Sequence, residues 1–249
     1  MRVFLWALAG MLAVSPLSLR ASLPEREIFH YTVEWRLIEA GRIRVESAPS
    51  QVRGEEGRQI DVALESVGLV SRLYKVDNRY RVSLWREFCA ADVFLKSNEG
   101  RKHRETHITF DPDARKARYH EQDVARNTVV LQKEIDIPPC VHDVIGGLFA
   151  LREKEMEPGR TIEMPVSDGK KAVAAKVEAQ EREQVRTKAG VFQTVRYEVY
   201  LFNGVLYRRR GRLQIWITDD ERRLPVQLRF RLGLTVGTLT IQLVKEEHR

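Results

Sequence analysis

A thiol, an imidazole and a carboxylate lie close together in the chain, as Cys140, His142 and Asp143. A thiol beside a histidine is the pattern of a cysteine nucleophile. Adjacent residues on a helix point about 100° apart, however, so His142 and Asp143 would not converge on one substrate atom. The favoured interpretation is that Asp143 is a helix-end carboxylate and His142 a surface or packing residue. A hydrolase or transferase that uses His142 and Asp143 is the alternative, and both stay candidate ligand-binding residues.

The densest positive cluster of the chain is Arg208-Arg209-Arg210, followed by Arg212. We expect a strand to start after Asn203-Gly204, and on a strand Arg208 and Arg210 share one face. Guanidinium groups present paired donors that suit phosphate and carboxylate oxygens. If this face points into a barrel, Arg208 and Arg210 are predicted to bind an anionic head group. If it points outward, they form a solvated patch that attracts anionic surfaces weakly, which is the favoured interpretation.

The histidines offer no metal site. His103 and His107 lie in a segment that alternates as a strand, and four residues of strand span about 13 Å, too far for one ion to bridge. The sequence also lacks the His-Glu-x-x-His order of zinc proteases, a phosphate-cradling glycine loop and a Cys-x-x-Cys motif. It therefore predicts neither a metal nor another cofactor.

The elements that must position these residues are mostly strands. Apolar and polar residues alternate from Phe29 to Leu37, and Ala40-Gly41 is predicted to turn the chain into a second strand over 42–46. Asp168-Gly169 marks another hairpin turn. The same alternation recurs over 60–64, 80–84, 108–110, 129–135, 162–166, 173–177, 192–201, 213–217, 226–232 and 239–243. This pattern predicts an all-β fold, a mainly antiparallel barrel or strongly curved sheet.

One segment has the period of an amphipathic helix. Apolar residues recur at helical spacing from Val141 to Leu151, after Pro139. Gly146-Gly147 weakens this helix, so we expect a close approach of its backbone to the sheet. The helix is predicted to cover one opening of the barrel, and a shorter helical turn is predicted within 66–74.

The start of the chain is typical of a secretory signal peptide. Met1-Arg2 is followed by residues 3–19, which carry no charge, and Pro16 interrupts the apolar stretch. This stretch is too short for a spanning helix of about 20 residues. We predict cleavage after Ala21, which leaves a single β-rich domain over 22–249, periplasmic or otherwise exported. No later apolar run has membrane length, so the mature chain is predicted to lack a transmembrane segment.

The net charge indicates which class of partner the protein would attract, and the cysteine content indicates whether it contains a disulfide. The net charge of +7 loses Arg2 and Arg20 with the signal peptide, which leaves +5 and favours anionic partners such as lipid head groups. Nucleic acid is disfavoured by the export signal. Cys89 and Cys140 are the only cysteines, and in an oxidising compartment they are predicted to form one disulfide. Two buried, unpaired thiols are the alternative.

Four motifs in order resemble a bacterial family of exported proteins called domain of unknown function 3108. The first hairpin of that family resembles Phe29–Trp35 with Ala40-Gly41, and its helix resembles Val141–Val144 with Leu151-Arg152. Its two late motifs resemble Thr187–Val195 and Ile215–Val226. The resemblance implies an exported β-sheet protein of unknown activity, and it supplies no catalytic residues.

Three functions follow from these observations. The leading hypothesis is a non-enzymatic binding or carrier module for an amphipathic or anionic envelope component, held in the mouth of the barrel. The second is the envelope hydrolase or transferase that uses His142 and Asp143. The third is a structural partner that associates through a sheet edge.

Overall fold

The structure is a computed structural model that describes residues 26–233 and 237–248. The predicted signal peptide and its cleavage site lie outside the described residues. The first eight strands are β1 (Glu27–Trp35), β2 (Ile38–Val52), β3 (Glu55–Ser66), β4 (Val76–Leu84), β5 (Ala90–Glu99), β6 (Lys102–Asp111), β7 (Lys116–Asp123) and β8 (Thr128–Asp136). The next six are β9 (Thr161–Ser167), β10 (Ala172–Thr187), β11 (Gly190–Val199), β12 (Gly211–Thr218), β13 (Pro225–Leu232) and β14 (Thr238–His248). The helices are α1 (Gly68–Leu73) and α2 (Val144–Arg152), with a short 3-10 turn at Arg86–Phe88.

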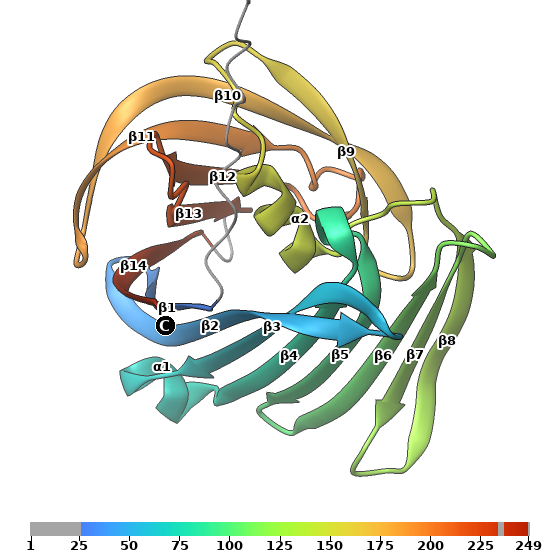
Figure 1. Cartoon of the computed structure of the whole chain (residues 1–249). Coiled ribbons are helices and arrows are strands. Elements are labelled where there is room, and N and C mark those ends of the chain that lie inside the picture. Colours follow the sequence, from blue (N-terminus) through green and yellow to red (C-terminus); the bar gives the residue numbers. More distant parts are fainter. Residues whose placement is uncertain (1–25, 234–236, 249) are drawn as a thin grey trace, which may run out of the picture.

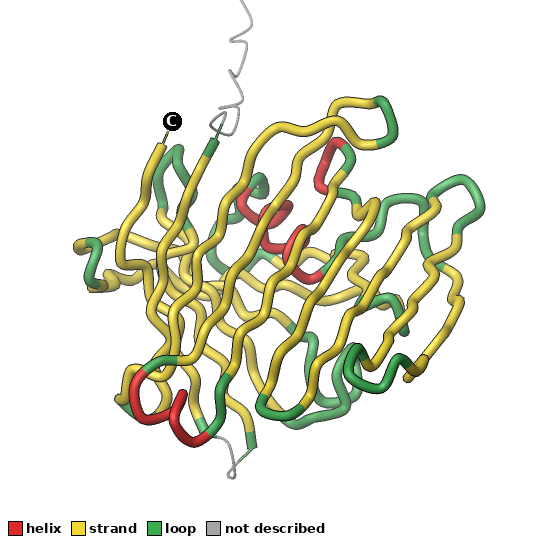
Figure 2. Tube along the Cα trace, turned by 90° about the horizontal axis from the view of Figure 1, so that it is seen from below, coloured by secondary structure: helices red, strands yellow, loops and turns green. Residues whose placement is uncertain are grey.

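These strands form one 14-stranded sheet in the order β8-β7-β6-β5-β4-β3-β2-β1-β14-β13-β12-β11-β10-β9 (Figure 1). Strands that follow one another in sequence are neighbours in each half of the sheet, and β1 pairs antiparallel with β14 at its centre. The sheet curves strongly around α2 (Figures 1 and 2). The predicted all-β, strongly curved antiparallel fold is therefore confirmed.

A two-residue seam connects distant strands across the open side of this curve. The carbonyl of Val141 accepts a hydrogen bond from the amide of Ala90, at the start of β5, with an N···O distance of 2.7 Å. On the other side, the His142 amide donates to Pro165 in β9 and the His142 carbonyl accepts from Ser167, both at 2.9 Å. Residues 141–142 thus join β5 to β9, and β6–β8 extend beyond the closed part of the sheet (Figure 1).

The disulfide between Cys89 and Cys140 lies directly beside the seam and confirms the predicted pairing. Each cysteine immediately precedes one of the two residues that form the Ala90–Val141 hydrogen bond. The two cysteines are 51 residues apart, and a loop of that length corresponds to about 4 kcal/mol in the chain-entropy model. The covalent bond therefore holds together both ends of the segment that contains β5–β8.

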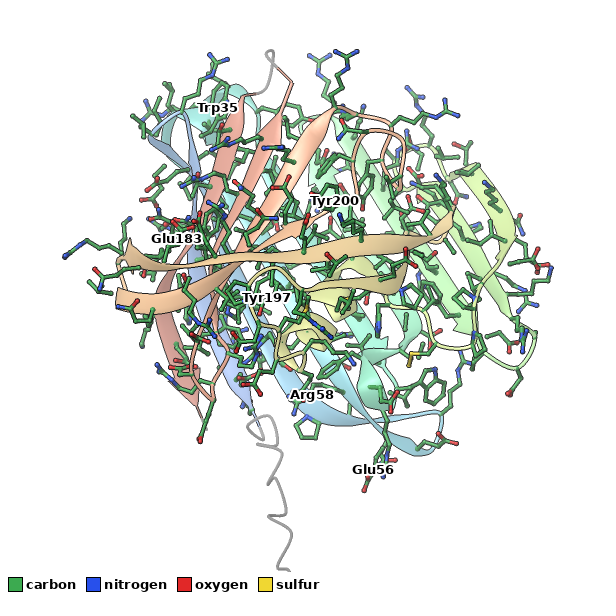
Figure 3. The ribbon with its side chains drawn as sticks, turned by 90° about the horizontal axis from the view of Figure 1, so that it is seen from above. Trp35, Glu56, Arg58, Glu183, Tyr197 and Tyr200 are labelled. Atoms are coloured by element: carbon green, nitrogen blue, oxygen red, sulfur yellow. A yellow bond between two sulfur atoms is a disulfide. The ribbon has the colours of Figure 1, made fainter. Side chains whose placement is uncertain are left out.

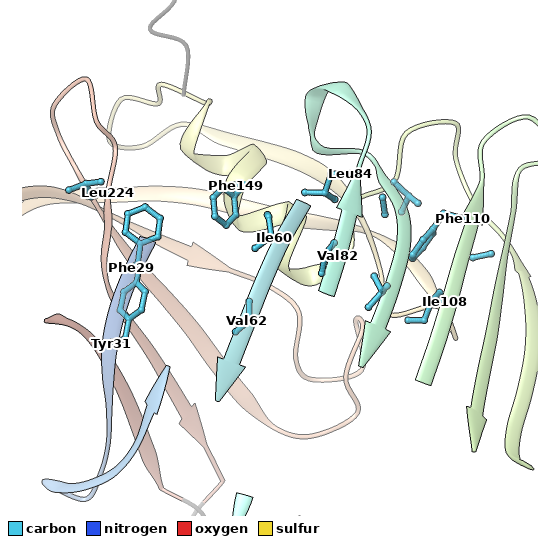
Figure 4. Packing of buried hydrophobic residues seen from close by; sticks show 14 of the residues in the cluster. Phe29, Tyr31, Ile60, Val62, Val82, Leu84, Ile108, Phe110, Phe149 and Leu224 are labelled. Atoms are coloured by element: carbon cyan, nitrogen blue, oxygen red, sulfur yellow. The ribbon is translucent and has the colours of Figure 1, made fainter. Parts of the chain in front are cut away.

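Helix α2 is shorter than predicted, because it begins at Val144 instead of near Val141. The backbone groups of Val141 and His142 pair with strands, which requires an extended conformation and delays the helix. Phe149 is 2 % exposed and belongs to the same buried cluster as Phe29 and Ile60 (Figure 4). Alternating inward-facing residues of the strands and one face of α2 thus fill this part of the interior.

The first hairpin turns earlier than predicted. The turn is Arg36-Leu37, and Ala40-Gly41 lies inside β2. A Cβ atom on Gly41 would lie 2.8 Å from the Glu65 carbonyl oxygen of β3, so glycine is needed there for close approach between strands. The prediction failed because a glycine required by the neighbouring strand looks like a turn residue in the sequence.

Candidate anion-binding site

A shallow hollow of about 300 Å³ lies where the loop over residues 200–210 meets the adjoining ends of β12 and β13. The loop leaves β11 at Tyr200, which is labelled in Figure 3. Three of the side chains that line the hollow are arginines, and we call it the arginine hollow. Its lining residues are Asn203, Arg210, Gly211, Arg212, Arg231, Leu232 and Gly233.

Asn203 fixes the shape of the loop. It has φ = 60° and precedes Gly204 with φ = 91°, a left-handed pair that asparagine and glycine tolerate well. The Asn203 side-chain amide donates to the Gly211 carbonyl at 3.0 Å and its oxygen accepts from the Gly211 amide at 3.2 Å. The loop therefore folds back onto the start of β12 and brings Arg210 beside Arg212.

The charges in the hollow are poorly compensated. Arg212 and Arg231 lie directly opposite each other on neighbouring antiparallel strands, an arrangement that is destabilising for like charges. Arg212 has one carboxylate partner, Glu198, with an N···O distance of 3.2 Å. Arg210 and Arg231 form no ion pair with any described residue. This local excess of positive charge is what an anion would neutralise.

Arg229 lies two residues before Arg231 on β13, and its pKa is affected by the charge of Arg231. Burial lowers the pKa of the Arg229 guanidinium, and the positive charge of Arg231 lowers it further. Arginine remains charged at any ordinary pH, so Arg229 stays protonated and adds to the positive charge beside the hollow. Because the hollow is open to solvent, its attraction for anions is expected to weaken as salt increases.

A second hollow, of about 310 Å³, lies on β7 and β8 and has mixed charge. Its lining includes Arg118 and Glu134, which already pair with each other at 2.9 Å. It therefore lacks the uncompensated charge of the arginine hollow.

The structure places Arg208 and Arg210 in the loop and not on a strand, because β12 begins only at Gly211. The expected strand after Asn203-Gly204 is wrong: hydrogen bonds from Leu206 and Tyr207 back to Leu201 keep this segment in turns. Both arginines are exposed, and of the two only Arg210 lines the hollow.

His142 and Asp143 lie at the seam, and their observed contacts are structural. The Nδ1 atom of His142 donates to the Phe88 carbonyl at 2.7 Å, and burial lowers the pKa of this imidazole. Asp143 is the N-cap of α2: its carboxylate accepts from the Ile145 amide at 2.8 Å and from the Gly146 amide at 2.9 Å. These contacts account for both side chains without a substrate, and their candidacy as ligand-binding residues stays a prediction.

His103 and His107 both lie on β6, as the alternation predicts. His107 packs against Phe94 with 4.5 Å between ring centroids, and His103 contacts the Asn98 side chain at 2.9 Å. No group of three or more histidine, cysteine or acidic side chains among residues 26–233 and 237–248 is arranged to hold a metal ion.

Arg231 and Asn203 are the site residues that sequence reasoning missed. Arg231 lies in an ordinary alternating strand, and nothing local marks it. Only the pairing register of β12 with β13 reveals that it faces Arg212. Asn203 was recognised as a turn residue, but its hydrogen bonds to Gly211 span eight residues and leave no sequence signature.

In the part of the chain that the structure describes, no helix is both long enough and apolar enough to cross a bilayer. No curated protein matches the chain in sequence. A solved β-barrel-like protein of the domain of unknown function 1849 family, from Brucella abortus, is similar over 92 % of this chain and 99 % of its own, with a TM-score of 0.59 and 10 % identity. This similarity shows a shared fold.

Two more distant structures cover comparable lengths. A candidate lipoprotein from Parabacteroides distasonis covers 90 % of this chain and 97 % of its own, with 9 % identity and a TM-score of 0.38. A candidate exported protein from Bacteroides fragilis covers 90 % of this chain and 96 % of its own, with 9 % identity and a TM-score of 0.33. The profile of the DUF3108 proteins, described as proteins of unknown function, matches residues 30–244. With nearly the whole described sheet inside that match, the chain belongs to the DUF3108 family.

Proposed function

We propose that the protein is an exported, non-enzymatic binding module that holds the anionic group of an amphipathic envelope component in the arginine hollow. One observation carries the proposal: Arg212 and Arg231 face each other on neighbouring strands, Arg210 lines the same hollow, and among the described residues Glu198 is their only carboxylate partner. A bound phosphate or carboxylate would offset this repulsion and accept paired guanidinium hydrogen bonds.

The position of the hollow favours a ligand that is held at the rim of the sheet and not inside it. The interior around α2 is packed with buried apolar residues such as Phe149 and Tyr197. An open surface hollow suits a small charged group that belongs to a larger molecule, such as a lipid head group.

Calorimetric titration with water-soluble, short-chain phosphatidylglycerol tests this proposal. Arg231→Ala and Arg210→Ala are expected to weaken binding about tenfold, since each removes a charge-assisted contact. Arg209→Ala is the matched control, because Arg209 is equally exposed in the same loop but does not line the hollow. Arg208→Ala tests the sequence-based prediction that Arg208 also contributes to binding of the anionic group.

Equal binding by Arg231→Ala and Arg209→Ala would overturn the proposal, as would the absence of any binding by the unmodified protein at low salt. Native mass spectrometry with lipid extraction, on protein purified from the periplasm, identifies the natural ligand directly.

A second candidate function is supported by the free edge of β8. Among the strands that the structure describes, β8 pairs only with β7, and it exposes Val129, Val130 and Leu131 by 58 %, 44 % and 37 %. An exposed apolar edge strand is a template for pairing with a strand of another chain. Val130→Lys is expected to abolish such pairing in sedimentation experiments with envelope extracts, while leaving anion binding unchanged.

A further inference from the structure

Helix α1 lies at the end of the sheet opposite the C-terminus (Figure 2). Large apolar side chains of α1 and of the β1–β2 turn are exposed. We call this group the apolar end. Its most exposed members are Leu37 and Leu73, at 95 % and 77 %. The full group is Leu37, Ile38, Leu69, Leu73 and Tyr74.

These residues come from two segments that lie side by side. The Val67 amide, at the start of α1, donates to the Ala40 carbonyl of β2 at 3.0 Å. Helix α1 has no buried residue, and Leu69 and Leu73 are one helical turn apart on its surface. The β1–β2 turn and α1 therefore present their leucines together.

The turn that carries Leu37 is chemically unusual. Arg36 and Leu37 have φ values of 49° and 68°, both in the left-handed region. Two-residue hairpin turns of this kind favour Asn-Gly, because a bulky side chain is disfavoured there. Leu37 thus adopts a backbone conformation that is unfavourable for leucine, and almost all of its side chain is exposed to water. Such costly positions are concentrated at functional sites.

Positive charges flank the apolar end on the side of α1. Arg72 lies on α1, Lys75 follows it, and Arg101 lies in the adjacent β5–β6 turn, where the Gly100 amide donates to the Lys75 carbonyl at 2.8 Å. All three side chains are exposed, and none forms an ion pair with a described residue. A bare apolar patch with a basic rim matches the surface of an anionic bilayer.

The arginine hollow lies at the same end of the sheet. Trp35, which is labelled in Figure 3, is the last residue of β1 and pairs with Leu239 of β14. The adjacent Thr238 pairs with Arg231. Arg231 in turn pairs with Arg212 of β12. Along the sheet, β13 and β12 are two and three strands away from β1, which corresponds to about 10–14 Å.

We propose that this end of the protein docks on an anionic phospholipid bilayer, with the leucines of the apolar end in the interfacial region and a lipid phosphate in the arginine hollow. This inference rests on the proposed function, and it identifies the binding partner of the protein as a membrane surface. A second copy of this chain fits less well, because a face-to-face pair would bring two basic rims together.

Co-sedimentation with vesicles tests the proposal, using phosphatidylglycerol with phosphatidylethanolamine and, separately, phosphatidylcholine alone. The variant Leu37→Gly with Leu73→Ser is expected to bind anionic vesicles about tenfold or more weakly, since each leucine loses its burial in the interface. Both residues are exposed, and glycine suits the φ of Leu37, so the variant is expected to fold. The control is Val129→Ser with Leu131→Ser, which removes two exposed apolar side chains from the distant edge strand β8.

Titration of the same variants with short-chain phosphatidylglycerol separates this inference from the proposed function. Loss of vesicle binding with unchanged binding of the short-chain lipid supports docking through the leucines. If the unmodified protein binds the short-chain lipid but not vesicles, or if the leucine variant binds vesicles normally, membrane docking is wrong and the arginine hollow stands. If neither lipid form binds, both proposals are wrong. If the leucine variant changes a dimer into a monomer but does not alter vesicle binding, the apolar end is an interface between two copies of this chain. That result would overturn membrane docking.

Discussion

Gly146 and Gly147 are neighbours on α2 with opposite surroundings. A Cβ atom on Gly146 would lie 2.6 Å from the Asp143 Oδ1 atom, 2.7 Å from the Leu84 side chain and 3.2 Å from the Phe88 carbonyl oxygen, whereas on Gly147 the nearest atom would be 3.7 Å away. The close approach predicted for the pair is therefore confirmed for Gly146 alone.

Gly146→Ala is expected to lower the free energy of unfolding by about 1–3 kcal/mol, because the helix must move away from β4. Gly147→Ala is the control and is expected to raise it by up to about 1 kcal/mol, through helix propensity. Urea denaturation of both variants measures the difference. Equal effects at the two positions would contradict the packing described for α2.

The Asp143 carboxyl gives stability a pH dependence. Burial raises its pKa from 3.8 to about 6, although the capping amides of Gly146 and Ile145 oppose the shift. The folded state then holds this proton over a range where the unfolded chain has released it. The contribution of this group to stability is thus complete below about pH 4 and is lost as the pH rises through about 6, by about 3 kcal/mol.

Asp143→Asn removes this titration and keeps one capping oxygen. Relative to the unmodified protein, the variant is expected to gain about 3 kcal/mol between pH 4 and pH 7.5, measured by denaturant titration at each pH. Because other carboxyls titrate equally in both proteins, the comparison isolates Asp143. A stability difference that does not change with pH would contradict the burial of this carboxyl.

At the scale of elements, one buried ion pair fixes α2 to the centre of the sheet. Arg152, the last residue of α2, donates to both carboxylate oxygens of Glu27 in β1, at 2.8 and 2.9 Å. It also donates to the carbonyls of Arg222 and Arg223, in the turn between β12 and β13. Three parts of the chain that are far apart in sequence therefore meet at one side chain that is 1 % exposed.

Arg152→Met is expected to lower the free energy of unfolding by about 3–5 kcal/mol, because it leaves the Glu27 carboxylate buried without its partner. Adding Glu27→Gln to that variant is expected to restore part of the loss, since the buried charge is gone. Thermal or urea unfolding of the single and double variants measures both effects. A double variant that is less stable than the single variant would contradict this account.

The strands and the site differ in how far sequence could predict them. The alternation of 162–166 and 173–177 about Asp168-Gly169 is local, and the structure reproduces it as β9, β10 and their turn. The start of α2 and the arginine hollow depend on partners that are distant in sequence. Val141 and His142 are extended because β5 binds the first and β9 binds the second, and Arg231 matters because Arg212 faces it. The alternation of apolar and polar residues does not indicate which strands pair with each other or in which register.

At the scale of the whole molecule, the predicted export determines where the mature protein begins. The predicted cut after Ala21 precedes β1, which begins at Glu27, so removal of the leader would leave every strand intact. N-terminal sequencing of protein recovered from the periplasm is expected to begin at Ser22. Recovered protein that begins at Met1 would contradict cleavage.

The pairing of the first strand with the last governs the order in which the sheet can assemble. Glu27 lies opposite His248, across 221 residues of chain (248 minus 27), whereas most other neighbouring strands are joined by short turns. Loop-closure entropy grows with the length of the loop, so the hairpins of each half are expected to form first and the β1–β14 contact last. When a chain emerges with its N-terminus first, β1 is available long before β14. The edge of β1 that pairs with β14 therefore stays unpaired until β14 arrives. Until then that edge is open to pairing with another chain, and if the chain is exported as predicted, this is the interval in which a chaperone outside the cytoplasm would act.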